Sequence, residues 1–396
     1  MCSFYINPFR LRRAWAAGPG LSEFEGDDIR SLHRSLPEYR PTPLHRLQGL
    51  AAKLGLGQVL VKDESHRFGL KAFKALGAAY AVYRFVQQRL TDAGAAADFY
   101  SREDVLPEGA FTFCTATDGN HGRGVAWVAR KLRQRAVIYM PSGSSRARVK
   151  AIEGEGARVI VVDGNYDEAV RQAAADAKAC GWQVISDTAW SGYEEIPRWI
   201  VAGYRTLFEE IDEALEADER PDIVIVPSGV GALAAAAAWH FRAHRADGQA
   251  RLVSVEPLEA ACMLESCQST DGAPVTCRGR LDSIMAGLNC GTPSTVAWPL
   301  IKIGFDLFMT VDDATVVRAM RTCYYPAPGD PQIVAGESGA AAMAALLALR
   351  DQPELAGARG ALGLGPGSTV LLLSTEGDTD PESFRRLVIA PGPPPA

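Results

Sequence analysis

Residues 222–244, DIVIVPSGVGALAAAAAWHFRAH, decide the fold. They begin as a run of β-branched apolar residues, pass through the turn Ser228-Gly229-Val230-Gly231 and continue into an alanine-rich segment that favours helix. A strand that passes through glycines into a helix is the unit from which parallel sheets are built. From about residue 58 the same order of short apolar run and helical segment recurs along the chain, and it predicts an α/β fold.

The recurring apolar runs predict more strands than one sheet usually holds. The candidate strands are residues 58–63, 111–116, 136–141, 158–163, 183–186, 222–227, 252–257, 306–311 and 369–374. Between several of them lie amphipathic segments, such as 72–90, 145–157 and 193–215, whose apolar positions recur at three and four as in crossover helices. Because nine strands are many for one ordinary sheet, we expect two open, twisted, mostly parallel sheets flanked by helices.

These elements are expected to form two domains. The predicted large domain comprises residues 1–77 and 169–396 and contains the turn Ser228-Gly229-Val230-Gly231. The predicted small domain comprises residues 78–168. The proline-rich end, 391–396, is expected to be a disordered tail. Residues 265–300 are rich in Gly, Pro, Ser, Thr and Cys with weak periodicity, and we expect this irregular stretch to line or cover a site.

Composition and charge exclude several classes of partner. The formal charge of -6 comes from 47 acidic and 41 basic residues with no long run of one sign, which disfavours nucleic acid and anionic lipid as partners. No stretch has the 18 or so apolar residues of a membrane span. Eight cysteines without a Cys-x-x-Cys pair predict reduced thiols, with a redox pair among Cys262, Cys267, Cys277 and Cys290 as a minor alternative. We expect a cytoplasmic protein with a small-molecule partner.

The turn after residue 227 has the outline of a phosphate cradle. Glycines allow close approach of the backbone, and the free N–H groups of the turn and first helical turn bind an anion without Lys or Arg. The predicted cradle consists of Ser228, Gly229, Val230, Gly231, Ala232 and Leu233. Taken by itself, the same pattern is also ordinary tight-turn chemistry.

A second loop, within 115–130, also follows a strand and opens a helix. Its five residues Asp118, Gly119, Asn120, His121 and Gly122 could hold a carboxylate on their N–H groups. The plainer alternative is an N-cap, because Asp and Asn both accept hydrogen bonds from free amides there. So many polar and glycine residues together exceed what a cap needs.

Two lysines mark a third segment. Lys71 and Lys74 stand three apart beside Phe68, Phe73 and Leu76, and an apolar environment lowers the pKa of a lysine and makes its free amine a nucleophile. The plainer reading is a lysine that faces solvent from an amphipathic helix. No metal site is expected: His240 and His244 have an i, i+4 spacing but no accompanying carboxylate, and are predicted to be surface or capping residues.

Five motifs in one order extend this reading to nearly the whole chain. They are Phe73-Lys-x-Leu-Gly-Ala, Asp118-Gly-Asn-His-Gly, Ser228-Gly-Val-Gly-Ala, Gly336-Glu-Ser-Gly-Ala and Leu373-Ser-Thr-Glu-Gly. Together, from about residue 40 to 380, they resemble the fold type II pyridoxal-phosphate enzymes, which include threonine dehydratases and the tryptophan synthase β chain. More narrowly, the segments RFGLKAFKALGAAYA, TATDGNHGRGVAW, SDTAWSGYEEIP, MAGLNCGTPS and STEGDTDP look like those of the diaminopropionate ammonia-lyase family.

The resemblance implies pyridoxal 5'-phosphate as cofactor and a role for each motif. Lys74 would carry the cofactor as a Schiff base, Asn120 would face its phenolic oxygen, and the loop from Ser228 to Leu233 would hold its phosphate. Ser374, with Thr375 as the near alternative, would offer a hydroxyl to the pyridine nitrogen. The chain has Lys71 where the family pattern has Asn, so two lysines compete for the cofactor, and the Phe-Lys-x-Leu-Gly-Ala context favours Lys74.

Two aspartates point to a cationic substrate. Dehydratases of hydroxy amino acids have a small neutral residue where this chain has Asp118, and Asp118 with Asp187 would select the β-ammonium of 2,3-diaminopropionate by charge. The resemblance implies elimination that yields pyruvate and two ammonia. Lys74 or Asp118 would remove the α-proton according to the face on which it lies, which predicts activity on the L enantiomer and, by the two-base reasoning, on the D enantiomer. Asp187 could instead cap the following helix, and Glu337 could approach the cofactor or begin a helix.

Other functions remain as alternatives at this stage. The first is a threonine or serine dehydratase, or another β-eliminating enzyme of the same fold, which would act on hydroxy amino acids. The second is a binding module that sequesters pyridoxal phosphate or an amino acid without turnover, and the intact Lys74, Asn120 and both aspartates count against it. The fold type also implies a homodimer.

Overall fold

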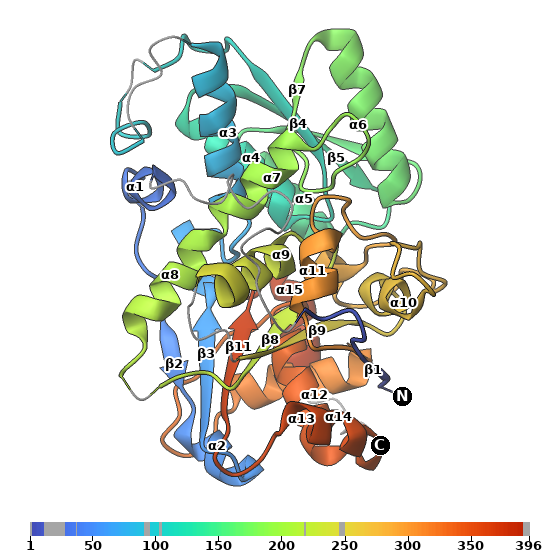
Figure 1. The fold of residues 1–396 in the computed structure, drawn as a ribbon. Helices are drawn as coiled ribbons and strands as arrows, with labels where there is room; N and C mark the ends of the chain where they lie inside the picture. Colours follow the sequence, from blue (N-terminus) through green and yellow to red (C-terminus); the bar gives the residue numbers. More distant parts are fainter. Residues whose placement is uncertain are drawn as a thin grey trace. The chain divides into compact units, whose positions relative to one another are not determined.

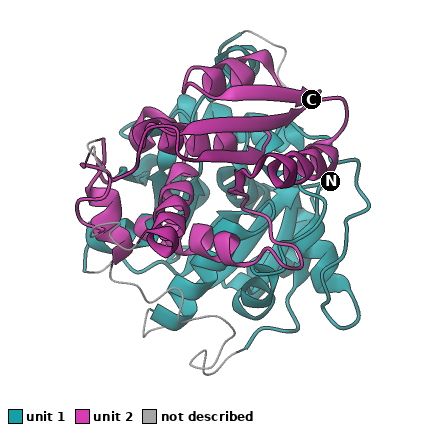
Figure 2. Ribbon diagram, turned by 90° about the horizontal axis from the view of Figure 1, so that it is seen from above, with its two compact units in different colours: residues 1–21, 42–66, 207–396 teal, residues 22–41, 67–206 magenta. Residues whose placement is uncertain are grey.

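The computed structural model describes residues 2–11, 28–36, 38–90, 96–102, 105–217, 219–244 and 250–390. The expected tail, 391–396, lies outside these ranges. The chain forms two compact units, one of Met1–Leu21, Thr42–His66 and Leu207–Ala396 and the other of Ser22–Pro41 and Arg67–Thr206, drawn teal and magenta in Figure 2. Each unit contains one of the two predicted sheets.

The first unit is built on a seven-stranded sheet with the order β1-β10-β9-β8-β11-β3-β2. Its strands are β1 (Phe4–Ile6), β2 (Leu44–Arg46), β3 (Gln58–Asp63), β8 (Ile223–Pro227), β9 (Arg251–Pro257), β10 (Leu307–Val311) and β11 (Thr369–Ser374). The five central strands are parallel, and β1 and β2 pair antiparallel at the two edges. Figure 1 shows β3, β11 and β8 side by side in this sheet.

Helices cover both faces of this sheet. They are α2 (Gln48–Leu54), α8 (Arg205–Ala214, which starts in the other unit), α9 (Ala232–Trp239), η3 (His240–His244), α10 (Cys262–Gln268), η4 (Ala286–Leu288), α11 (Trp298–Gly304), α12 (Asp313–Tyr324), α13 (Ala341–Asp351), η5 (Pro353–Leu355), α14 (Ala356–Leu362), α15 (Pro381–Phe384) and η6 (Arg385–Ile389). In β8, Ile223 and Ile225 belong to the core that packs on α13, and Val224 and Val226 are equally buried on the opposite face. Burial of both faces is why these strands read as continuous apolar runs.

The second unit is built on a four-stranded parallel sheet with the order β6-β5-β4-β7. Its strands are β4 (Thr112–Ala116), β5 (Arg135–Pro141), β6 (Arg158–Val162) and β7 (Gln183–Val184). Its helices are α1 (Asp28–Arg34), α3 (Ala75–Arg89), α4 (Asn120–Lys131), α5 (Arg146–Glu153), α6 (Tyr166–Cys180) and α7 (Glu195–Gly203), and η2 (Glu64–Gly69) spans the chain boundary between the units. Alanines of α6 pack on β4 and β5 in a small core.

The structure confirms the α/β class and all nine predicted strands, with ends shifted by at most two residues. It adds β1 and β2, which are only three residues long and therefore show no alternation in the sequence. The expected helix over 193–215 is two helices, because the chain bends at Tyr204 between α7 and α8.

The compact units differ from the expected domain division. Residues 169–206 lie with the small sheet because β7 pairs with Phe113 and Cys114 of β4, and α7 packs against α3. Residues 67–77 belong to the same unit, so that Lys74 and the loop at Asp118 share it. Residues 22–41 also join it, although the sequence placed them in the large domain.

Candidate functional site

In the first unit, four loops meet at the carboxyl ends of the central strands. The Ser338 N–H donates to Glu376 Oε1 at 3.0 Å, and the Gly336 N–H donates to the Glu376 carbonyl at 2.9 Å. The Gly287 N–H donates to Ser338 Oγ, and the Ser294 N–H donates to the Val230 carbonyl at 2.8 Å. The motifs around residues 228, 336 and 374 therefore come together, and the irregular stretch within 265–300 lines them as expected.

The predicted phosphate loop has the backbone of an anion cradle. Gly231 is the N-cap of α9 with a φ of 101°, and no side chain of the described residues caps this helix. A Cβ at Gly231 would lie 2.6 Å from Ile301 Cδ1 and 2.7 Å from Met263 Cε, so a larger residue does not fit. At Gly229 a Cβ would approach Cys290 Sγ at 3.0 Å. The first-turn N–H groups of α9 are thus left to bind an anion.

Ser374 ends β11, the strand next to β8. It is 3% exposed, and its Oγ is buried with no hydrogen-bond partner among the described residues. Since β8 and β11 are parallel and paired, both the phosphate loop and Ser374 leave the sheet at the same edge. A buried hydroxyl without a partner marks a position at which a ligand atom would complete the hydrogen bonding. The neighbouring Thr375 is 5% exposed, and Ser374 is the better supported of the two candidates.

In the second unit, Lys74 stands at the start of α3, where α4 approaches closely. A Cβ at Gly124 of α4 would lie 3.1 Å from Ala75 Cα, so only glycine allows this contact without displacement. A Cβ at Gly77 would lie 2.7 Å from Ile200 Cγ2 of α7, so α3 is also pressed against α7. Helix packing on both sides fixes the base of the Lys74 side chain.

Lys74 pairs with Asp187, which follows β7. Lys74 Nζ donates to Asp187 Oδ2 at 2.5 Å, and the two side chains are 19% and 7% exposed. Burial acts to raise the pKa of Asp187, but the charge of Lys74 and the hydrogen bond from Lys74 are the main causes that oppose it and hold this pKa at about 2. Asp187 does not cap a helix, because α7 begins only at Glu195 and its N-cap is Glu194.

Asp118 lies in the same unit and is not a helix cap. The Thr117 hydroxyl accepts hydrogen bonds from the Gly119 N–H at 2.9 Å and the Gly122 N–H at 3.1 Å, and so performs the capping that the sequence offered to Asp118. Within the described part of the chain, no hydrogen bond is made to the Asp118 carboxylate. Burial raises the pKa of Asp118 to about 7; the charge of Asp187 adds to this, while those of Arg148 and Lys74 oppose it.

His121, quoted in the motif without a role, completes this cluster. Its Nε2 lies 2.8 Å from the Ile185 carbonyl, which can only accept, so the ring carries a proton on Nε2. Its Nδ1 is buried, 3.9 Å from Asp187 Oδ2, with no hydrogen-bond partner among the described residues. Burial is the main cause that lowers the pKa of His121, and Lys74 adds to it against the opposing charge of Asp187. The ring is therefore neutral at neutral pH.

Sequence reasoning missed Tyr204. This residue is fully buried where α7 gives way to α8, its ring packs on that of Phe73 at a centroid distance of 4.7 Å, and its hydroxyl has no partner among the described residues. Burial raises its pKa, with opposing effects of the charges of Lys74 and Asp187. No local signal identifies it, because it stands in a segment that reads as one continuous helix.

The remaining sequence candidates lie in several different surroundings. Lys71 has a φ of 60°, a left-handed conformation that Asn tolerates better than Lys, so the Asn that the resemblance implies here would suit this backbone. Asn120 is the first residue of α4, and Glu337 is buried but lies outside α13, whose N-cap is Ala340. His240 is fully buried and its Nε2 lies 3.1 Å from Asp212 Oδ2, so the expectation of a surface or capping residue was wrong for it.

Metal and disulfide chemistry find no support. The described residues contain no cluster of three or more His, Cys, Asp or Glu side chains that could hold a metal ion. None of the eight cysteines forms a disulfide within the described ranges, so the alternative of a redox pair among Cys262, Cys267, Cys277 and Cys290 is not formed. Across the same ranges, no helix is long and apolar enough to cross a membrane.

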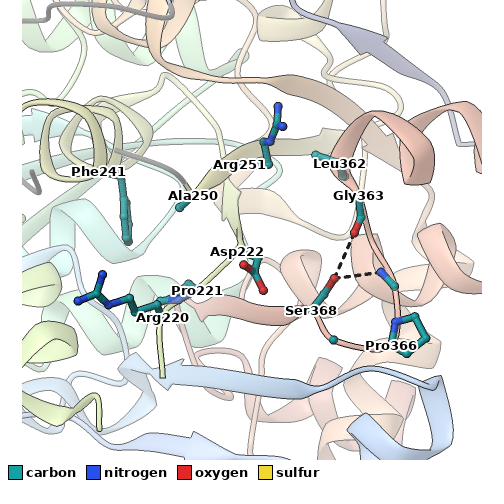
Figure 3. Close-up of a pocket in the computed structure, with 12 residues that line it drawn as sticks. Arg220, Pro221, Asp222, Phe241, Ala250, Arg251, Leu362, Gly363, Pro366 and Ser368 are labelled. Atoms are coloured by element: carbon teal, nitrogen blue, oxygen red, sulfur yellow. Dashed lines mark hydrogen bonds between the residues drawn. The ribbon is translucent and has the colours of Figure 1, made fainter. Parts of the chain in front are cut away.

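A separate hollow of about 470 Å³ lies at the opposite edge of the large sheet (Figure 3). It is lined by the residues that begin β8, β9 and β11, including Asp222 and Ser368. The Ser368 hydroxyl accepts from the Gly365 N–H and donates to the Gly363 carbonyl, and Asp222 accepts from the Thr369 N–H at 2.8 Å. The polar groups of Ser368 and Asp222 are thus hydrogen-bonded within the protein. No residue of the five motifs lines this hollow.

The residues present fit a pyridoxal-phosphate cofactor. The first unit offers a glycine cradle for a phosphate at the start of α9 and the unpartnered Ser374 hydroxyl on the neighbouring strand. The second unit offers Lys74 and the start of α4 at Asn120. The cradle matches a phosphate, and the Ser374 hydroxyl matches a ring nitrogen that accepts a hydrogen bond. The Lys74 amine matches an aldehyde.

Comparisons with known proteins agree with this chemistry. A family model described as pyridoxal-phosphate dependent enzyme matches residues 36–373. The diaminopropionate ammonia-lyase of Salmonella typhimurium is 39% identical over 95% of this chain and 96% of its own length. Two crystal structures of Escherichia coli diaminopropionate ammonia lyase are similar in fold. The complex with D-serine has a TM-score of 0.89 at 37% identity, and the complex with an aminoacrylate-PLP azomethine reaction intermediate 0.86 at 38%, each covering 98% of this chain and 97% of that chain.

Proposed function

Because the chain belongs to the pyridoxal-phosphate dependent enzymes and, among them, to the diaminopropionate ammonia-lyases, we propose that it eliminates ammonia from 2,3-diaminopropionate. The products are pyruvate and two molecules of ammonia. The observation that carries this proposal is the cluster in the second unit, where Lys74 lies 2.5 Å from the Asp187 carboxylate and Asp118 supplies a second carboxyl. Two carboxylates beside one lysine suit a substrate with a cation at its β-carbon.

We assign the cofactor to the residues that carry the motifs. Pyridoxal phosphate, when bound, withdraws electrons from the α-carbon of an amino acid and makes its C–H bond acidic. The N–H groups of Ser228 to Leu233 would hold its phosphate, Lys74 would bind its aldehyde carbon, and Asn120 would face its phenolic oxygen. Ser374 would supply a hydroxyl to the pyridine nitrogen, a role supported by its buried Oγ, which has no hydrogen-bond partner in the described part of the chain.

Lys74 and Asp118 are the proposed bases. Each takes the α-proton from the face of the substrate on which it lies, so that the two residues serve opposite enantiomers. A base works best with a pKa near the working pH, and the pKa of Asp118 at about 7 meets this condition. The hydrogen bonds that cap α4 come from Thr117, which leaves the Asp118 carboxylate available for this task.

Asp187 is proposed to act on the leaving group. An amine departs readily only as neutral ammonia from the protonated form, when the C–N bond breaks and its electron pair leaves with nitrogen. An ionised Asp187 carboxylate, which pairs with the Lys74 ammonium at 2.5 Å in this structure, would keep an adjacent β-ammonium protonated in the same way and therefore ready to leave. The enamine that remains, 2-aminoacrylate, takes up water after release and yields pyruvate and the second ammonia.

Assembly and compartment belong to the same proposal. We infer a homodimer from the fold type, to be checked by sedimentation velocity of the purified protein. We infer a cytoplasmic enzyme because eight cysteines without a Cys-x-x-Cys pair suit a reducing compartment.

The direct test follows cofactor and product together. We expect a visible absorption band of the Lys74-bound cofactor that K74A abolishes and K71N retains, because Lys71 differs from Lys74 in lying outside the Asp187 pair. L- and D-2,3-diaminopropionate should each give pyruvate and two ammonia per molecule, with serine and threonine much poorer. If serine or threonine is the better substrate, the protein is a dehydratase. A formed band without turnover of any amino acid would indicate a binding module.

A further inference from the structure

We infer that His121 and Asp187 form a pair of acceptors that receives the β-ammonium of the substrate, and that His121 is thereby a specificity-determining residue. This inference rests on the proposed function and names the groups that read the substrate's second amine. The pair consists of His121 Nδ1 and Asp187 Oδ2, which lie 3.9 Å apart in the second unit.

The two atoms cannot satisfy each other. Nε2 of His121 donates to the Ile185 carbonyl at 2.8 Å, which places the proton of the neutral ring on that nitrogen and leaves Nδ1 with a lone pair. Asp187 is an ionised carboxylate and is also only an acceptor. Two buried acceptors that face each other need a donor with at least two hydrogens between them.

An ammonium group has the right geometry for this position. Its N–H bonds diverge by about 109°, so two acceptors at hydrogen-bond distance from one ammonium nitrogen lie about 4.5 Å apart. The observed 3.9 Å is close to that span. In the structure, Lys74 Nζ supplies such an ammonium at 2.5 Å from Asp187 Oδ2. A Lys74 that serves as a base must be the neutral amine, so its positive charge no longer faces Asp187, and the β-ammonium of the substrate takes that place.

A histidine with a purely structural role would look different. In protein cores nearly all buried polar atoms have a hydrogen-bond partner, and a structural histidine would have both ring nitrogens satisfied. Here the side chain is 5% exposed, Nε2 is anchored, and Nδ1 has no partner among the described residues. The charged groups that act on the ring are Asp187 and Lys74. The anchored nitrogen fixes the ring so that the other nitrogen faces Asp187.

The two acceptors distinguish an ammonium from a hydroxyl by the number of hydrogens that each group can donate. An ammonium has three N–H bonds and satisfies both acceptors, whereas the hydroxyl of serine has one O–H bond and leaves one acceptor buried without a partner. Sites built for hydrogen bonding reject an analogue that lacks the matching donor more strongly than apolar pockets reject a change in size. The aspartates select the substrate by its charge. His121 adds a selection by the number of hydrogens that the substrate's β-substituent can donate.

Two substitutions separate the two nitrogens of the ring. In H121Q the side-chain amide retains a donor near the position of Nε2 for the Ile185 carbonyl but loses the acceptor at Nδ1. In H121N the amide oxygen retains an acceptor near the position of Nδ1 but loses the bond to Ile185. A role in packing alone predicts similar effects of both, and a role as acceptor predicts that only H121Q loses discrimination.

The experiment measures binding apart from turnover. α-Methyl-2,3-diaminopropionate and α-methylserine lack the α-proton and cannot react further, so their dissociation constants can be read from the absorption spectrum of the cofactor-loaded enzyme. We expect H121Q to weaken binding of the diamine at least tenfold and that of α-methylserine less than threefold, and H121N to keep most of the preference. D187N should lose the same preference for the diamine. Addition of H121Q to D187N should lower that preference little further, because both residues bind one ammonium.

Other outcomes overturn the inference. An unchanged ratio of the two dissociation constants in H121Q, or equal weakening of both ligands in H121Q and H121N, would make His121 a structural residue. If H121Q does not bind cofactor, wild type, H121N and D187N are compared instead. If H121N then loses the preference for the diamine as completely as D187N does, the acceptor role of His121 is contradicted. A wild-type enzyme that produces no pyruvate from diaminopropionate would refute the proposed function, whereas normal turnover with an unchanged H121Q ratio refutes only the inference.

Discussion

The Lys74 ammonium lies 2.5 Å from Asp187 Oδ2, although 113 residues separate the two in the chain. The contact joins the start of α3 to the residues that follow β7, and packing of α3 on α7 brings these segments together. Both side chains are largely buried, so the pair is electrostatically stronger than an exposed one. It supplies the charge at the centre of the proposed site and stabilises the second unit.

The D187N variant should destabilise the cofactor-free protein in a pH-dependent manner. The pKa of Asp187 in the folded state, about 2, is below the ordinary 3.8, so its stabilisation is present above about pH 4 and is lost as the pH falls toward 2. From this shift we expect D187N to lower the free energy of unfolding at pH 7 by about 2 kcal/mol. Urea unfolding at pH 7, 5 and 3.5 measures the difference, which should shrink at the lowest pH.

An exposed ion pair provides the control for this prediction. Asp351 Oδ2 lies 2.6 Å from Arg318 Nη1, with both side chains more than 40% exposed. Because exposed pairs stabilise little, D351N should change the free energy of unfolding by less than about 0.5 kcal/mol. A D187N difference that is the same at all three pH values would contradict the prediction.

The D118N variant should separate the two enantiomers. If Asp118 is the base on one face only, its loss lowers kcat/KM for one enantiomer of 2,3-diaminopropionate by about 10² to 10⁴ and for the other by less than about tenfold. With a pKa near 7 the carboxyl must lose its proton to act, so kcat/KM for the sensitive enantiomer should rise with pH through about 7 in the wild type and lose that limb in D118N. Equal losses for L and D substrates would exclude the one-face role.

Local sequence signals predicted the sheets and the glycine turn after β8 well. Seven of the nine predicted strands are largely buried apolar runs, and such runs are visible without knowledge of the partner strands. Gly231 and its neighbours could be recognised because turn chemistry depends on a few consecutive residues. The strands β1 and β2 escaped because three residues are too few to show a period.

Features that depend on tertiary contacts could not be predicted. The sequence did not show that Thr117 rather than Asp118 caps α4, because both residues stand at the same loop and only the backbone geometry separates them. The unit boundaries follow from the pairing of β7 with β4, which no local pattern encodes. His121 Nδ1 and the Tyr204 hydroxyl became candidates only when their burial and lack of partners were known.

The G231A variant should weaken cofactor binding. Alanine is strained at a φ of 101°, and its Cβ would lie within 2.7 Å of Ile301 and Met263, so the loop must shift away from the geometry that presents its N–H groups. We expect the dissociation constant for pyridoxal phosphate to rise at least tenfold, measured by fluorescence titration of the cofactor-free protein. G360A is the matched control, because Gly360 lies in α14 with no atom within 4 Å of an added Cβ. Equal affinities of the two variants would show that the loop does not hold the phosphate.

The Y204F variant should make the cofactor-free protein more stable and the enzyme less active. The Tyr204 hydroxyl is fully buried without a hydrogen-bond partner among the described residues, and a desolvated polar group in that state costs about 1 to 3 kcal/mol. Removal of the oxygen should therefore raise the free energy of unfolding by about 1 kcal/mol in urea. We expect kcat/KM for diaminopropionate to fall about tenfold, because the hydroxyl is a donor next to Lys74 and Asp187.

Y100F is the matched control for Y204F. The Tyr100 hydroxyl is also buried but donates to the Ala79 carbonyl at 2.7 Å, so its loss should lower the free energy of unfolding by about 1 kcal/mol. Equal destabilisation by both substitutions would mean that the Tyr204 hydroxyl contributes to the fold rather than to the site.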